Sequence, residues 1–232
     1  MGTGFNDANQ FGGEETSLRG LAFELKNPLI NIARQAELGD QESYLNIQQT
    51  AEQALMLIDS YLLNAQTEYG QIMLDLAPAS IGSVLYDVST QLRTQASQRN
   101  FSLVLDDRTC EPVMTHRPAL TSILSVFGSS LMGLDSTSRR EMVLRGYKTR
   151  TGKLGVGMFT KAKISQMDIK RALDLQGRAH MPFSGVNART HVSLAIAGGL
   201  CRAVGGEMTV KHMGGLSGLA TELPRSEQLA FV

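Results

Sequence analysis

Two adjacent stretches of helical periodicity constrain this chain more than any other feature of its sequence. Apolar residues recur every three or four positions over 18–36 and again over 47–69. This spacing places them on one face of each helix, so each helix has an apolar seam. Gly39 favours a helix end between the two stretches, and Asp40 or Ser43 can cap the second helix. We therefore expect an antiparallel hairpin, and packing of two copies into a four-helix bundle would cover both seams in a homodimer.

After Gly70 the pattern changes to short strands that alternate with helices, which indicates an α+β fold. We expect helices over 80–99, 117–134 and 194–204, and strands over 73–78, 101–106, 113–115, 141–149, 153–165, 207–213 and 216–223. The predicted organisation is a flexible N-terminal segment over 1–14, the hairpin over 15–70 and a second domain over 71–228.

The composition excludes several classes of function. The chain has 232 residues, and its 22 lysines and arginines equal its 22 acidic residues, so no overall charge attracts nucleic acid or an acidic membrane. Cys110 and Cys201 are too few for a disulfide framework or a zinc site. No signal peptide and no apolar run long enough for a membrane span is recognisable. We expect a cytoplasmic protein without a bound metal or cofactor.

The first helix contains a short polar box within its apolar pattern. Residues 22–29 read Ala-Phe-Glu-Leu-Lys-Asn-Pro-Leu. This box resembles the Ser-His-Glu-Leu-Lys-Asn-Pro-Leu box of sensor histidine kinases, in which a dimerising hairpin carries the phosphoacceptor histidine. The resemblance implies that residues 71–228 form a two-layer α/β sandwich of the Bergerat, or GHKL, type, which binds ATP in that family. Phe23 occupies the phosphoacceptor position.

A phenyl ring at position 23 cannot accept a phosphoryl group as the histidine of that family does. Phosphotransfer needs a nucleophilic nitrogen that attacks the γ-phosphoryl group, and the side chain of Phe23 has no lone pair. We therefore predict that the chain is not an active histidine kinase.

The resemblance also implies a nucleotide site, and the chain departs from the family at each of its boxes. In the helix that usually carries two asparagines, Val126 and Ser130 occupy the asparagine positions. For the Asp-x-Gly-x-Gly box, the best match places Phe159 at the aspartate position and Lys161 and Lys163 at the glycine positions.

In the third box, the glycines are replaced by Arg189, His191 and Ser193, while Leu-Ala-Ile remains after them. Glycines at such positions let backbone N–H groups approach phosphate at a helix N-terminus. Side chains at these positions would crowd that approach. We interpret the three changes together as a preserved fold with a degenerate nucleotide site.

These observations predict a regulatory pseudokinase of two-component signalling. It would bind a response regulator, or another receiver-type partner, through Phe23, Glu24, Lys26, Asn27 and Pro28. Two alternatives stay open. Glu24 and Asn27 share one helical face and could act as a phosphatase of the partner's aspartyl phosphate, with Asn27 orienting water. Alternatively, the altered nucleotide pocket could bind a different small molecule and make the protein a sensor.

Overall fold

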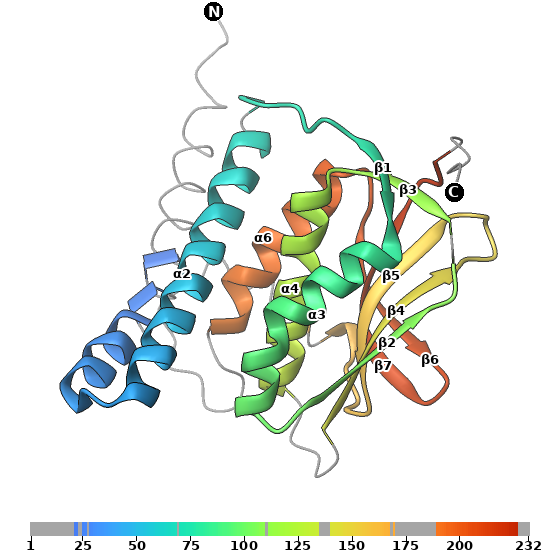
Figure 1. Ribbon diagram of the computed structural model, residues 1–232. Helices are drawn as coiled ribbons and strands as arrows, with labels where there is room; N and C mark the ends of the chain where they lie inside the picture. The colour runs from blue at the N-terminus through green and yellow to red at the C-terminus, as the bar shows by residue number, and fades with distance from the viewer. Residues whose placement is uncertain are drawn as a thin grey trace, which may run out of the picture.

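A helical hairpin leads into a mixed sheet that is covered on one face by helices (Figure 1). The computed structural model describes residues 21–22, 25–26, 28–68, 70–109, 111–134, 140–167, 169 and 189–226.

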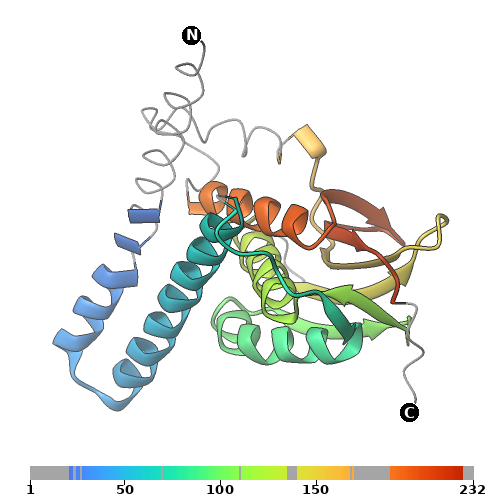
Figure 2. The ribbon, with the colours of Figure 1, turned by 90° about the horizontal axis from the view of Figure 1, so that it is seen from above.

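The hairpin consists of a helix that ends at residue 38 and of α2 (Gln41–Glu68). Gly39 lies between them with φ of +69°, a left-handed conformation that glycine adopts without the strain of a side chain. The backbone N–H of Ser43 donates to Oδ1 of Asp40 at 2.7 Å, so Asp40 caps α2. The predicted break at Gly39 is confirmed, and Figure 2 shows the two helices as the arms of the hairpin.

The sheet has five strands in the order β2-β4-β5-β7-β6. Strands β2 and β4 are parallel, and the other neighbouring pairs are antiparallel. A separate antiparallel pair, β1 with β3, lies outside this sheet. The predicted strands are found, although β1 begins and ends later than expected and β5 ends earlier. The bounds are β1 (Ala77–Ser80), β2 (Ser102–Asp107), β3 (Pro112–Thr115), β4 (Glu141–Lys148), β5 (Leu154–Thr160), β6 (Met208–Met213) and β7 (Leu216–Leu223).

Helices α3 (Ile81–Gln98), α4 (Arg117–Leu134) and α6 (Arg189–Ala203) cover one face of the sheet (Figures 1 and 2). The sequence places α3 and α4 to within a residue or so, whereas α6 begins five residues before the predicted start. The side chain of Ser80 caps α3 by accepting from the backbone N–H of Ser83 at 3.4 Å. The predicted apolar face of α3 is buried, at Ile81, Val84, Leu85, Val88, Leu92 and Ala96.

Strand β5 is buried along its whole length and separates two apolar clusters. Leu154, Val156 and Met158 belong to the large core between the sheet and the helices. Phe159 belongs to a small cluster with Val143 and Ala220. Successive side chains of a strand point to opposite faces of a sheet. The small cluster therefore lies on the face of the sheet that turns away from the helices.

Helix α2 has a second apolar face that the sequence analysis did not identify. Leu57, Tyr61 and Leu63 pack against the large core. Leu55 and Leu62, which belong to the predicted seam, remain 59% and 49% exposed. Tertiary packing therefore uses a different face of α2 from the one that the hairpin pattern indicated.

Cys201 in α6 should be unreactive in the folded protein. Its side chain is fully buried, and burial raises the pKa of the thiol to about 12, so the thiol stays protonated at pH 8. In a Cys110→Ser variant, we expect Ellman's reagent to label the unfolded protein in guanidinium chloride and to leave the native protein unlabelled. Rapid stoichiometric labelling under native conditions would show that α6 does not shield this thiol.

Candidate functional site

Helices α3 and α4 are joined by a ladder of serine and glutamine side chains. The hydroxyl of Ser125 donates to Oε1 of Gln91 at 3.0 Å, and the hydroxyl of Ser129 donates to Oε1 of Gln95 at 2.9 Å. Each pair is four residues from the other on both helices, so the rungs lie one turn apart. The opposite side of α4 carries the fully buried residues Leu120, Ile123, Leu124, Phe127 and Leu131.

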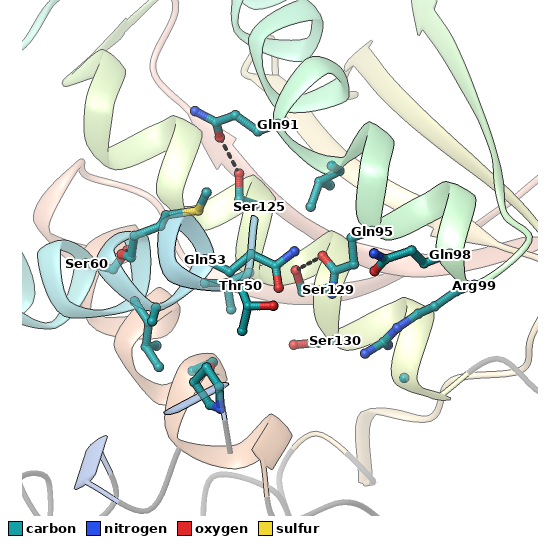
Figure 3. A pocket seen from close by; sticks show the side chains of 18 of the residues that line it. Thr50, Gln53, Ser60, Gln91, Gln95, Gln98, Arg99, Ser125, Ser129 and Ser130 are labelled. Carbon is teal, nitrogen blue, oxygen red and sulfur yellow. Dashed lines mark hydrogen bonds between the residues drawn. The ribbon is translucent and has the colours of Figure 1, made fainter. Parts of the chain in front are cut away.

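A cavity of about 370 Å³ lies between this ladder and the hairpin. Figure 3 shows the lining side chains, among them Thr50 and Gln53 of α2, and the dashed rungs of the ladder. Residues from both hairpin helices, α3, α4 and the first turns of α6 contribute to the lining. The site is therefore formed jointly by the hairpin and by the part of the chain that follows it.

The described lining mixes polar with apolar side chains and is almost uncharged. Arg99 is the single cation among the described lining residues, and no aspartate or glutamate is found among them. The amide side chains are those of Asn31, Gln53, Gln91, Gln95 and Gln98. The hydroxyl side chains are those of Thr50, Ser60, Ser125, Ser129, Ser130 and Ser193.

The cavity brings together residues that the sequence analysis assigned to two separate sites. Val126, Ser130 and Ser193, from the degenerate nucleotide site, all line it. Pro28, from the box assigned to partner binding, lines it as well. Val126 is half-buried and Ser130 is 5% exposed. The box and the degenerate nucleotide site therefore meet in one cavity, which the sequence did not predict.

Phe159 and Lys161, which the sequence analysis assigned to the same site, are not among the described residues that line this cavity. Phe159 is fully buried in the small cluster on the other face of the sheet, where its ring meets the edge of Tyr147 at a centroid distance of 6.3 Å. Lys161 is exposed and pairs with Glu141 at 3.7 Å. A shift of one residue along a strand moves every side chain to the opposite face of the sheet. Thr160, next to Phe159, lies on the same face as Met158.

Several predicted site residues lie outside the described part of the chain. These are Phe23, Glu24 and Asn27, together with the side chains of Arg189 and His191. Lys26 is described and exposed. The phosphatase alternative depends on Glu24 and Asn27, so it stays a prediction.

Helix α2 closes the cavity through contacts that sequence reasoning missed. The side-chain N–H of Gln98 in α3 donates to Oδ1 of Asn46 at 3.0 Å and to Oε1 of Gln49 at 3.4 Å. At the other end of α2, Asn64 lies so close to Gly199 of α6 that a Cβ atom there would be 1.8 Å from Oδ1 of Asn64. The three-and-four spacing of Ala54, Leu57, Tyr61 and Asn64 was the signal that could have indicated this second face.

The described residues were compared with the requirements of a metal site and of a membrane-spanning helix. No group of three His, Cys, Asp or Glu side chains in that part of the chain could hold a metal ion. None of the described helices combines the length and hydrophobicity needed to cross a bilayer.

Comparisons with known proteins identify the fold. No family model and no curated protein matches the sequence. The structure is similar to the histidine kinase AdeS of Acinetobacter baumannii, with a TM-score of 0.58 and 14% identity over 88% of this chain and 98% of that chain. It is also similar to full-length ShkA in complex with AMPPNP, with a TM-score of 0.59 and 18% identity over 94% of this chain and 47% of that chain.

The chain has the fold of a histidine-kinase transmitter region. The resemblance that the box at 22–29 indicated is therefore confirmed at the level of the fold. Val126 and Ser130 of α4, which the sequence analysis assigned to a degenerate nucleotide site, both line the cavity.

Proposed function

We propose that this chain is a regulatory protein of two-component signalling that keeps the transmitter fold without using ATP as a phosphoryl donor. It acts as a homodimer and binds a receiver-type partner through the hairpin around Phe23. The observation that carries the proposal is the chemistry of the cavity at the degenerate nucleotide site.

The described lining of this cavity does not fit a magnesium triphosphate. Proteins hold such a ligand with lysine or arginine side chains, with backbone N–H groups at glycine-rich turns, and with carboxylate or amide oxygens on the ion. Here Arg99 is the single cation among the described lining residues, and no carboxylate accompanies it. The hydroxyls of Ser125 and Ser129 are already bonded to glutamines of α3.

The surface of the first helix supports a role in protein binding. Leu29 and Leu38 are 60% and 66% exposed, and Lys26 within the box is exposed as well. Exposed apolar side chains next to a charge are typical of protein contacts. A receiver-type partner is the class that the resemblance of the box implies.

Helix α2 supports the homodimer in the same way. Leu55 and Leu62 are seven residues apart, so they lie on one face two turns apart, and both are exposed. The part of the hairpin that packs on the core uses Leu57 and Tyr61, on another face. The face of Leu55 and Leu62 remains available for the hairpin of a second copy.

Restoring the phosphoacceptor should not restore kinase activity. We expect no transfer of label from γ-labelled ATP with magnesium to the whole chain carrying Phe23→His. The imidazole supplies a nucleophile, but the described lining of the cavity offers one cation and no carboxylate to hold the donor. An active histidine kinase serves as the positive control. Acid-labile label on the variant that is absent from the unchanged protein would overturn the proposed loss of ATP use.

Partner binding should depend on the box. With the whole chain immobilised, we expect Phe23→Glu to weaken binding of a cognate receiver domain by about tenfold or more, since a charge would enter the contact. Tyr86→Glu is the matched control, because Tyr86 is a 60% exposed aromatic residue on α3, away from the hairpin. Equal affinity of the two variants would argue against binding through Phe23.

A further inference from the structure

We propose that the cavity between α2 and the serine–glutamine ladder is a binding site for a small, uncharged molecule that carries hydroxyl and amide groups. The inference rests on the proposed function in one respect only, namely that this cavity does not hold ATP. It names a class of ligand for a site at which the sequence did not indicate which small molecule binds.

The lining favours hydrogen bonds in both directions. A carboxamide offers two N–H donors and a carbonyl acceptor, and a hydroxyl can donate and accept. Gln53 of α2 supplies an amide (Figure 3). Gln95 keeps its N–H donors beyond its bond to Ser129, and the hydroxyls of Thr50 and Ser129, which donate within the protein, can still accept. Sugars, nucleosides and similar molecules present the same mixture of donors and acceptors.

The charge of the lining selects against charged ligands. A multiply charged anion would meet one guanidinium, that of Arg99, among the described lining residues, and a cationic ligand would meet no carboxylate there. Moving an ion out of water without a compensating charge is unfavourable, whereas a neutral polar molecule needs only matched hydrogen bonds. The described lining therefore fits an uncharged ligand best.

Ser130 provides a second, independent observation. Its side chain is 5% exposed, and it lines the cavity from α4. Among the described residues its hydroxyl has no hydrogen-bond partner, in contrast to Ser125 and Ser129 on the same helix. Buried polar groups are normally paired, so a hydroxyl that faces a cavity without a protein partner indicates that a bound molecule or water completes the bond.

The cavity is also of a suitable size and position. Its volume of about 370 Å³ lies within the range of small-molecule sites in proteins. Pro28 and Gln53 come from the hairpin, and Gln95 and Ser130 come from α3 and α4. A molecule bound here would contact both halves of the chain, and by linkage it would stabilise their docked arrangement.

Calorimetric titration of the whole chain with three neutral probes tests the inference: N-acetylglucosamine, trehalose and adenosine. We expect at least one of them to bind with a Kd below about 1 mM. Gln53→Leu keeps the size of the side chain and removes its amide, and Ser130→Ala removes the unpartnered hydroxyl. Each should weaken binding about tenfold or more, because one polar contact to the probe is lost.

Gln66→Leu is the matched control, because Gln66 is an exposed glutamine on α2 that does not line the cavity. This variant should bind the probe with the same affinity as the unchanged protein. The inference is overturned if none of the probes binds at concentrations of about 10 mM. It is also overturned if a probe binds equally well to the Gln53→Leu and Ser130→Ala variants. A parallel titration with magnesium ATP separates the two proposals. Tight binding of ATP would refute the proposed function. If neither ATP nor any of the probes binds, this inference alone is refuted.

Discussion

Replacement of Gly218 by valine is expected to abolish the folded state of the sheet. Gly218 lies in β7 opposite Phe159 of β5, in the interior of the five-stranded sheet. A Cβ atom at this position would lie 2.0 Å from the carbonyl oxygen of Met158 and 2.7 Å from Cδ1 of Phe159. The nearest atom belongs to the backbone, so no side-chain rotation can relieve the overlap, and the two strands would have to separate.

The expected loss exceeds about 4 kcal/mol, a magnitude that only a few mechanisms reach and that is comparable to the whole stability of many domains. Far-ultraviolet circular dichroism during urea denaturation should show no cooperative transition for the Gly218→Val variant. Thr209→Val in the neighbouring strand β6 is the control, because it introduces the same residue type with almost no change in volume. If the Gly218→Val variant unfolds cooperatively with a stability close to that of the unchanged protein, β5 and β7 are not packed as described.

Replacement of Gly199 by alanine is expected to loosen the docking of α2 on α6. Within a helix, alanine is normally favoured over glycine by about 1 kcal/mol. Here the added Cβ atom would lie 1.8 Å from Oδ1 and 2.8 Å from Cγ of Asn64, so the Asn64 side chain must turn away. Asn64 would then lose its hydrogen bond to Glu68, which is 3.4 Å long. We expect a net destabilisation of about 1–2 kcal/mol, within the range for overpacked sites.

Two further variants test the cause of this effect. Gly198→Ala, one residue earlier in α6, places its Cβ atom no closer than 3.6 Å to Cε of Met208, so it should be neutral or stabilising. Asn64→Ala combined with Gly199→Ala should recover stability, with a coupling free energy of about 1 kcal/mol or more between the two positions. Urea denaturation of the unchanged protein, of the Gly198→Ala, Gly199→Ala and Asn64→Ala variants and of the double variant measures these differences. Equal stability of the Gly198→Ala and Gly199→Ala variants would contradict the close approach of α2 to α6.

This docking connects the fold to the proposed function. Helix α2 contributes Leu57 and Tyr61 to the large core, and it also contributes Gln53 to the cavity. A change that loosens α2 should therefore alter the cavity as well as the stability of the chain. The Gly199→Ala variant offers a way to separate binding in the cavity from binding of a partner at the outer surface of the hairpin.

The sequence by itself determined the local structure, because periodicity fixes which residues share a face. The spacing of apolar residues located α3 and α4 to within a residue or so, and Gly39 located the turn of the hairpin. The box at 22–29 indicated the transmitter fold, which the structure bears out. The sequence also shows directly that position 23 has no nucleophilic side chain, because this inference requires no knowledge of packing.

Only the tertiary structure decided which element covers each face. The periodicity of α2 is compatible with two apolar faces, and the choice between Leu55 and Leu57 depends on the surface that the core presents to the helix. Phe159 lies on the face of the sheet that turns away from the helices, and the alternation of a strand does not say which of its two faces meets them. The meeting of Pro28 with Ser130 in one cavity joins segments a hundred residues apart, and no local pattern in the sequence encodes such a distance.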